Sequence, residues 1–392
     1  MDKDSQNFPI DGKRDNPCSG KYMYVHRLPS RFNSDSLKDS RTLNKWFDMC
    51  SSIMNSGFGP RIETPQVIFH NRMKQYKCLT NNSSMASAVF VPFYAGLDVG
   101  RYLWDYNTTV RDCLPYDIVD WLRNRAEWKR LWGQDHFFTI WKSTGLGGNK
   151  LMPLPESMNM TMLSTETSSY CNEFSVPYPT YFRPSTYIDV IHWQKQVRSR
   201  KRRYLFYFAS APHPTMNDSI RIQIINKCLT SKNTCKLLDC NSSANKCGTP
   251  VQVLKVFRNS VFCLHPPGDS YTMCSMFNSI LAGCIPVFFH PYSAYAQYIW
   301  YFPKNYTSYS VYIPANDIKH GSVSINESLS RFPEDRVVAM RKEVVKLIPK
   351  RVEKVKKDAK EEKDPSVGFA AWNCWKLKLS GIMGDPPLEQ LF

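Results

Sequence analysis

Residues 261–289 read VFCLHPPGDSYTMCSMFNSILAGCIPVFF. The apolar run VFCL is followed by a polar loop, then by a stretch with helical character that ends at Gly283, and then by a second apolar run. This order predicts a buried strand, a helix and another buried strand, the repeating unit of a parallel sheet covered by helices. Gly283 suits the end of the helix because glycine adopts the left-handed backbone at little cost.

The loop at 265–270 is the expected ligand site of this unit, because open parallel sheets bind ligands beyond the carboxyl ends of their strands. Gly268 allows a close backbone approach, and Asp269 or Ser270 can cap the helix. The free N–H groups and the dipole of the helix start can hold a pyrophosphate without a metal. The pattern alone leaves an ordinary turn open as well, since neither GxGxxG nor GxxxxGK[ST] is present.

Alternating strands and helices surround this unit and predict a doubly wound α/β domain in the second half of the chain. The expected elements are a strand at 204–209, a helix at 218–230, a strand at 235–239, a helix at 250–259, a strand at 261–264, a helix at 271–282 and a strand at 285–289. Beyond 333, apolar residues at helical spacing predict a basic amphipathic helix that packs on this domain.

The first half has a mixed pattern. Strands are expected at 22–25, 67–69, 88–91 and 136–140, and a helix at 117–131. The segment 145–186, rich in Gly, Ser, Thr, Met and Pro, is expected to form linking loops.

The length of 392 residues exceeds the roughly 250–300 at which single cores stop growing, which favours two domains. The predicted division is a polar segment at 1–15, a first domain at 16–195, a second domain at 196–350 and a basic helix and tail at 351–392. The 14% aromatic content gives a first indication of surfaces that face carbohydrate.

The formal net charge of +17 and the basic run at 195–203 would suit nucleic acid or an acidic membrane surface. The run directly precedes the apolar stretch 204–209, as the solvated end of a helix does before a buried strand. No helix-turn-helix, zinc-ligand spacing or RNA-binding signature accompanies the charge. We therefore expect no nucleic-acid partner.

Thirteen cysteines without a CxxC pair disfavour zinc or thioredoxin-type chemistry and favour a secretory compartment, as do eight Asn-X-Ser/Thr sites. Cys263 and Cys284 lie in apolar runs and are expected to be buried thiols. Disulfides are expected instead to staple an irregular segment that holds Cys228, Cys235, Cys240 and Cys247. No signal peptide or apolar span of about twenty residues is present. Either an anchor lies outside this sequence, or the gene model is short at its start, or the secretory interpretation is wrong.

Several sequence blocks, in a fixed order from residue 16 to about 350, carry a family resemblance. The most characteristic is FCLHPPGDSYTMCSMFNSILAGCIPVFFHPYSAYAQYIWYFPKNYTSYSVYI at 262–313. The others are NPCSGKYMYVHRLPSRFN (16–33), VIFHNRMKQYKCLT (67–80), VFVPFYAGLD (89–98), WGQDHFF (132–138), CNEFSVPYPTYFRP (171–184) and YLFYFASAPHP (204–214). Together they resemble the plant exostosin-like glycosyltransferases, specifically the xyloglucan galactosyltransferase branch.

The resemblance implies a GT-B fold, in which two Rossmann-like α/β domains face each other across a cleft. It implies inverting, metal-independent transfer of galactose from UDP-galactose to xylosyl side chains of xyloglucan. One alternative is an enzyme of the same family that uses another donor, such as a UDP-uronic acid or UDP-arabinose. The other alternative is a non-catalytic subunit of a Golgi complex. The Golgi lumen, a membrane anchor absent from this sequence and complexes with other xyloglucan-synthesising enzymes are implied as location and partners.

The resemblance also implies the donor site. Arg221, Gly268, Asp269 and Ser270 would lie near the pyrophosphate. Apart from the resemblance, His290 is expected near the donor by its position straight after the last strand, where it could touch a sugar hydroxyl or merely hold a turn. The family usually has Thr-Arg-Arg where this chain has Thr272-Met273-Cys274, and Phe-Asp where it has Phe277-Asn278. Asn278 therefore replaces an aspartate suited to the ribose hydroxyls, and the loss of charged partners can weaken donor binding.

The base that takes the proton from the acceptor hydroxyl is expected among Asp135, His136 and His26. All three are expected to end strands or loops of the first domain that face the cleft. Alternatively, Asp135 caps a turn, His136 is a core histidine and His26 orients substrate. Aromatic residues could stack on sugar faces, although each is more often core: Tyr178, Tyr181, Trp193, Tyr295, Tyr298 and Trp300.

Overall fold

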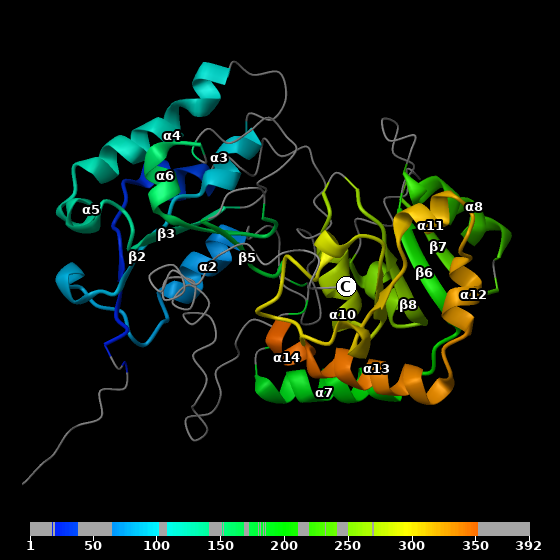
Figure 1. The fold of residues 1–392 in the computed structure, drawn as a ribbon. Helices are drawn as coiled ribbons and strands as arrows, with labels where there is room; N and C mark the ends of the chain where they lie inside the picture. Colours follow the sequence, from blue (N-terminus) through cyan, green and yellow to red (C-terminus); the bar gives the residue numbers. More distant parts are fainter. Residues whose placement is uncertain are drawn as a thin grey trace, which may run out of the picture.

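The computed structural model of the chain contains two parallel sheets, each covered by helices (Figure 1). The structure describes residues 18, 20–37, 65–101, 108–140, 151, 153–167, 172–178, 180, 182, 184, 186–210, 219–231, 233–240, 250–268 and 270–351. This architecture of two α/β domains, known as GT-B, confirms the predicted fold class.

The first sheet has the strand order β1-β2-β3-β4-β5, and every neighbouring pair is parallel. Its strands are β1 (Met23–Val25), β2 (Ala88–Val91), β3 (His136–Ile140), β4 (Thr161–Ser164) and β5 (Glu173–Ser175). Its helices include α2 (Pro65–Met73), α3 (Ala95–Arg101), α4 (Thr108–Arg123), α5 (Ala126–Leu131) and α6 (Pro155–Asn159).

The second sheet has the order β10-β9-β8-β6-β7 and is also parallel. Its strands are β6 (Tyr204–Ser210), β7 (Cys235–Asp239), β8 (Ser260–His265), β9 (Ile285–Phe288) and β10 (Val311–Tyr312). Its helices are α7 (Tyr187–Ser199), α8 (Ile220–Thr230), α9 (Pro250–Phe257), α10 (Cys274–Leu281), α11 (Ala315–Lys319), α12 (Ile325–Ser330), α13 (Glu334–Lys346) and α14 (Ile348–Arg351).

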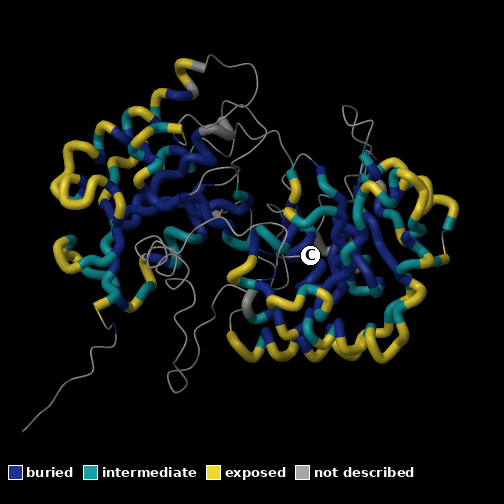
Figure 2. The backbone as a smooth tube through the Cα atoms, in the orientation of Figure 1, coloured by how far each residue is buried: buried dark blue, intermediate teal, exposed yellow. Residues whose placement is uncertain are grey.

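Helices cover both faces of the second sheet, as a doubly wound domain requires. Phe206 and Phe208 of β6 belong to a core shared with α8, α10 and α13, whereas Tyr207 belongs to a core shared with α7 and α9. Successive strand residues point to opposite faces, so β6 contributes to both cores. Figure 2 shows the strands buried inside and exposed turns along α7 and α13.

Three sequence expectations about the first domain are wrong. The apolar triplet 67–69 lies within α2, and a short apolar run does not separate a strand from a buried helical turn. The expected helix at 117–131 is divided between α4 and α5, because Arg125 has extended backbone angles. The segment 145–186 is not only loops, because it contains α6, β4 and β5. The two strands are short and carry Ser, Thr and Glu among their apolar residues.

Helix α7 packs against the second sheet, although the predicted domain boundary at residue 195 falls within it. Trp193 donates from Nε1 to the carbonyl oxygen of Leu281 at 2.8 Å, and Gln194 donates from Nε2 to that of Val345 at the same distance. These contacts are to α10 and α13, which places α7 with the second set of elements.

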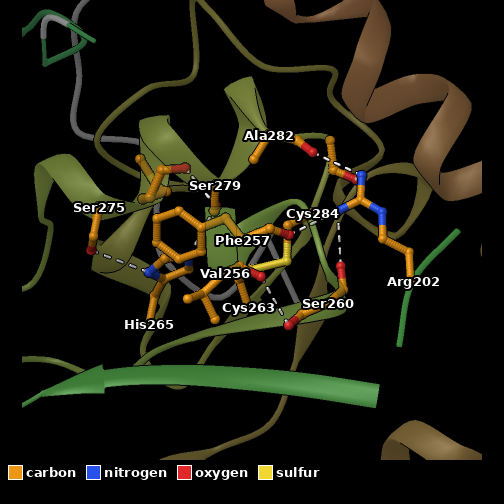
Figure 3. Close-up of a disulfide and its surroundings, with 12 residues drawn as sticks. Arg202, Val256, Phe257, Ser260, Cys263, His265, Ser275, Ser279, Ala282 and Cys284 are labelled. Atoms are coloured by element: carbon orange, nitrogen blue, oxygen red, sulfur yellow. Dashed lines mark hydrogen bonds between the residues drawn. A yellow bond between two sulfur atoms is a disulfide. The ribbon is translucent and has the colours of Figure 1, made fainter. Parts of the chain in front are cut away.

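Cys263 and Cys284 are buried, as expected, but they form a disulfide between β8 and the start of β9 (Figure 3). The expectation of two thiols is therefore wrong. Cys228 and Cys235 are bonded within the segment expected to be stapled, and Cys240 is also disulfide-bonded; Cys247 lies outside the described residues. A further disulfide joins Cys18 and Cys78.

Arg202 shows that the basic run at 195–203 is not only a solvated surface. Its guanidinium donates to four backbone oxygens at 2.8 to 3.1 Å, those of Phe257, Ser260, Ala282 and Gly283 (Figure 3). Burial lowers the pKa of Arg202 to about 9. Arg202 therefore links, through hydrogen bonds, the segments that lead into β8 and β9.

Candidate functional site

The loop after β8 brings Gly268 against Arg221 of α8. A Cβ on residue 268 would overlap with the Arg221 guanidinium, so glycine is the residue that leaves room for this cation. Arg221 lies in the first turn of α8, where its backbone N–H donates to the Ser219 N-cap at 3.3 Å. The structure thus brings together two predicted donor-site residues, 47 positions apart in sequence, beyond the carboxyl end of β8.

Ser270 does not cap α10, contrary to one sequence expectation. Its hydroxyl donates to the carbonyl oxygen of Thr272 at 2.6 Å, and the N-cap residue of α10 is Met273, whose side chain makes no capping hydrogen bond. Asp269, the other expected cap, lies outside the described residues. A helix start whose N-cap side chain does not satisfy its N–H groups suits an anion, because the dipole adds partial positive charge there.

Three residues depart from the family pattern, Met273, Cys274 and Asn278, and the last two are buried in the fold. Cys274 is disulfide-bonded and only 8% exposed. Asn278 is buried and donates from Nδ2 to the carbonyl oxygen of Cys274 at 3.2 Å. The second of the two replaced arginine positions, residue 274, is therefore occupied by part of a disulfide.

His290 follows β9 and precedes the 3₁₀ helix η4 (Pro291–Ser293). Its Nδ1 accepts a hydrogen bond from the backbone N–H of Tyr292 at 3.2 Å. Its ring stacks on that of Tyr271, with 4.3 Å between centroids. Burial lowers the pKa of His290 below its ordinary value of 6.5, which favours a neutral imidazole.

The first domain meets this site through residues 165–167, directly after β4. Glu166 accepts a hydrogen bond through Oε1 from the backbone N–H of Tyr271 at 2.9 Å, and its side chain is buried. The hydroxyl of Tyr298 contacts both sides: it donates to the carbonyl oxygen of Thr165 at 2.5 Å and lies 3.2 Å from Thr272 Oγ1. The sequence prediction missed this segment because it fell within the expected loops.

A second contact lies close by. The side-chain oxygen of Gln297 accepts hydrogen bonds from the backbone N–H of Thr167 at 2.8 Å and from the hydroxyl of Ser175 at 2.5 Å. The carboxyl ends of β4 and β5 therefore face the second domain. Because all strands of the first sheet are parallel, this edge is the carboxyl edge of the whole sheet.

The three candidates for the base form one buried network. His136 contacts Asp135 through Nδ1 at 2.7 Å and His26 through a 3.1 Å contact between the two Nε2 atoms. Asp135 is also paired with Arg130. Burial opposes the ionisation of Asp135, but hydrogen bonds from His136 and Arg130 outweigh it and lower its pKa. Burial, followed by the charges of His136 and Arg125, lowers the pKa of His26 to about 3.

Of the three candidates, expected to end strands or loops that face the cleft, His26 follows a strand, Asp135 ends the turn that leads into β3, and His136 begins that strand. His136 is the first residue of β3, so both it and Asp135 lie at the amino edge of the sheet, away from the edge that contacts the second domain. His26 does follow β1, but its ring packs inward against Trp121 and His136.

The neighbouring turn explains the WGQDHFF block. Gly133 has a φ of 84°, and a Cβ there would overlap with the ring of Trp128. That ring in turn contacts His136 edge-on, with 5.2 Å between centroids. The block thus holds a tight turn into β3, and this arrangement favours a structural role for Asp135 and His136.

The aromatic residues that the sequence singled out divide between core and surface. Trp193 and Tyr298 are buried, so the packing interpretation is confirmed for them. Trp300 is 49% exposed, Tyr178 and Tyr295 are partly buried against the core, and Tyr181 lies outside the described residues.

Two features are absent from the part of the chain that the structure describes. No group of three or more His, Cys, Asp and Glu side chains there is arranged to hold a metal ion. No helix there is long and apolar enough to cross a membrane. The metal-independent mechanism stays a prediction.

Known proteins resemble the chain over most of its length. It is 51% identical over 366 residues to "Probable xyloglucan galactosyltransferase GT12" of Arabidopsis thaliana, covering 85% of this chain and 72% of that one. It is 48% identical to "Xyloglucan galactosyltransferase MUR3" of the same plant, in a match that covers 87% of this chain and 59% of that protein. A third relative, "Xyloglucan-specific galacturonosyltransferase 1", also of Arabidopsis thaliana, is 37% identical. The match covers 81% of this chain and 51% of that protein. Residues 17–329 match the profile described as "Exostosin GT47 domain". The chain belongs to the exostosin GT47 family of glycosyltransferases.

Proposed function

We propose that this protein transfers galactose from UDP-galactose to xylosyl side chains of xyloglucan, with inversion at the anomeric carbon, in plant hemicellulose synthesis. The relatives of about 50% identity carry the name xyloglucan galactosyltransferase, whereas the relative named for galacturonic acid is less similar. This difference supports galactose as the sugar.

The observation that carries the proposal is the juxtaposition of Arg221 and Gly268 beyond β8, beside the start of α10. The acceptor hydroxyl forms a bond to the anomeric carbon as the bond from that carbon to UDP breaks. The negative charge then grows on the leaving diphosphate, which a guanidinium and helix N–H groups stabilise. Asp269, Ser270, Asn278 and His290 remain predicted contacts of the donor.

The proton of the acceptor hydroxyl needs a base, which we predicted among Asp135, His136 and His26. Replacing each separately by alanine tests this assignment. A turnover at least about a hundredfold lower in a variant that still folds and binds UDP would identify the base. Loss of stability alone would mark the network as structural, in keeping with its burial.

The secretory location is likewise a proposal. The disulfides support an oxidising compartment, and we propose the Golgi lumen, with a membrane anchor and xyloglucan-synthesising partners. Sensitivity of the protein from plant microsomes to a glycosidase that removes N-linked glycans would support this location; a reduced, unglycosylated cytosolic protein would contradict it.

Calorimetric titration with UDP tests the donor site directly. We expect saturable binding that Arg221→Ala weakens by at least about tenfold, since a charged hydrogen-bond partner is worth about 1.5–3 kcal/mol. The absence of binding at millimolar UDP would contradict the proposal and favour a non-catalytic family member.

A further inference from the structure

Three aromatic rings meet beyond the carboxyl ends of β8 and β9. Tyr271 stacks on His290, with an angle of 17° between the planes and 4.3 Å between the centroids. The ring of Tyr292 completes the group, at 5.8 Å from Tyr271 and 5.9 Å from His290. The rings come from two loops, one leading into α10 and one following β9. We call this group the aromatic platform.

The two tyrosines of the platform are exposed and His290 is partly exposed, unlike the aromatic residues that build the core nearby. Tyr271 is 47% exposed and Tyr292 is 37% exposed, whereas Phe277 of α10 and Tyr298 are fully buried. Tyrosine offers an apolar ring and a polar hydroxyl, a combination found where a ligand has both apolar and hydrogen-bonding surfaces. A pyranose ring has this character, with C–H groups on its faces and hydroxyl groups at its rim.

The position of the platform relates it to the reaction. Tyr271 directly follows Ser270 and precedes α10 by two residues, and its backbone N–H is held by Glu166 of the first domain. The platform therefore stands where the two domains meet, beside the proposed diphosphate site. An acceptor must approach from this junction to reach the sugar on the diphosphate.

We propose that Tyr271 and Tyr292 form a stacking platform for a pyranose ring of the acceptor glycan, and that His290 supports the platform by stacking against Tyr271. This inference rests on the proposed function and assigns an acceptor subsite within it. The rings set the plane of the sugar, and the hydrogen bond that the Tyr271 backbone N–H donates to Glu166 holds the loop that carries Tyr271 against the first domain.

Steady-state kinetics with a xyloglucan oligosaccharide and UDP-galactose test the platform. Tyr271→Ala and Tyr292→Ala should each raise the KM for the oligosaccharide by at least about tenfold and leave the KM for UDP-galactose within about twofold of the parent value. Tyr271→Phe keeps the ring and should retain most of the affinity. Tyr116→Ala is the matched control, because Tyr116 is 50% exposed on α4 of the first domain. It should change neither constant.

An unchanged oligosaccharide KM in both alanine variants would overturn the platform. A rise in the UDP-galactose KM with an unchanged oligosaccharide KM would also overturn it, because the rings would then hold the donor. Thermal unfolding identifies any variant that fails to fold, in which case the other alanine variant decides.

Direct calorimetric binding of the oligosaccharide separates this inference from the proposed reaction. If the parent protein transfers no galactose but binds the oligosaccharide, and Tyr271→Ala abolishes that binding, the platform stands and the proposed reaction fails. If the parent transfers galactose and Tyr271→Ala binds the oligosaccharide equally well, the reaction stands and the platform fails.

Discussion

The carboxylate of Glu166 accepts a hydrogen bond from the backbone N–H of Tyr271 across 105 residues of sequence, at 2.9 Å. Glu166 is the second residue after β4, and Tyr271 lies in the loop before α10. The bond therefore joins the first domain to the loop that leads into the proposed donor helix. The loop between β8 and α10 is thereby held from both domains.

This contact predicts the behaviour of two replacements. Glu166→Ala should lower galactose transfer by at least about tenfold, because it removes the acceptor that holds the loop. Glu166→Gln should retain most of the activity, since an amide oxygen also accepts a hydrogen bond. Turnover and both KM values are measured. Glu156→Ala is the control, because Glu156 of α6 pairs with Arg123 of α4 and not with the loop before α10. A Gln variant as inactive as the Ala variant would show that the charge itself is required.

Gly268→Ala should weaken UDP binding by at least about tenfold. The new Cβ would overlap with the Arg221 guanidinium and displace it. Calorimetry measures the affinity. Gly321→Ala is the control: Gly321 has open space around it, but its φ is 69°, so this change should lower stability by about 1 kcal/mol and leave UDP binding unchanged. Equal UDP affinity in Gly268→Ala and the parent would contradict the assigned position of Arg221.

The Cys263–Cys284 disulfide should contribute to stability. It closes a loop with a sequence separation of 21, which corresponds to about 3 kcal/mol. The double replacement by alanine should lower the free energy of unfolding by at least this amount in urea titrations without reductant. Cys113→Ala, at an exposed cysteine outside any disulfide, should have no effect. Similar stability of the double variant and the parent would mean that Cys263 and Cys284 do not form the disulfide seen in the structure.

His265 predicts sensitivity to acid. Its ring lies in the core near Ser279 and Ser275, and burial lowers its pKa to about 3 (Figure 3). The unfolded chain binds a proton at an ordinary pKa of 6.5, so the stabilising contribution is complete above pH 6.5 and is lost as the pH falls from 6.5 towards 3. Each pH unit inside this window is worth roughly 1 kcal/mol.

Urea unfolding at pH 7, 6 and 5 measures this dependence. His265→Gln should lower the stability at pH 7 and flatten its decline between pH 6 and pH 5, since glutamine does not titrate. The parallel variant at the surface histidine, His320→Gln, should leave both unchanged. The same decline in His265→Gln and the parent protein would contradict the assignment to His265.

Most of the second domain could be predicted because β6 to β9 are mainly apolar and alternate with helices, whereas the two-residue strand β10 was not predicted. Its central unit, β8, α10 and β9, lies where the spacing around Gly283 indicated. Glycine at 283 has a φ of 65°, as the predicted helix end requires. The approach of Arg221 to Gly268 also agrees with the expected location of the site.

The first domain was less accessible to sequence reasoning. The strands β4 and β5 are only four and three residues long and mix polar with apolar side chains, which gives no usable alternation. The base candidates illustrate a different limit: the sequence places His136 next to an apolar run but does not say at which edge of the sheet that run begins. Contacts such as those of Glu166 with Tyr271 and Cys263 with Cys284 depend on the packing of separate elements.

The most direct test is transfer itself. The purified protein is incubated with xyloglucan oligosaccharide and, separately, with UDP-galactose, UDP-galacturonic acid and UDP-arabinose, and the products are read by mass spectrometry. We predict a product heavier by one hexose with UDP-galactose, and its loss in Arg221→Ala. A product with only one of the other donors, or none with UDP-galactose while the protein is folded and both substrates are saturating, would contradict the account.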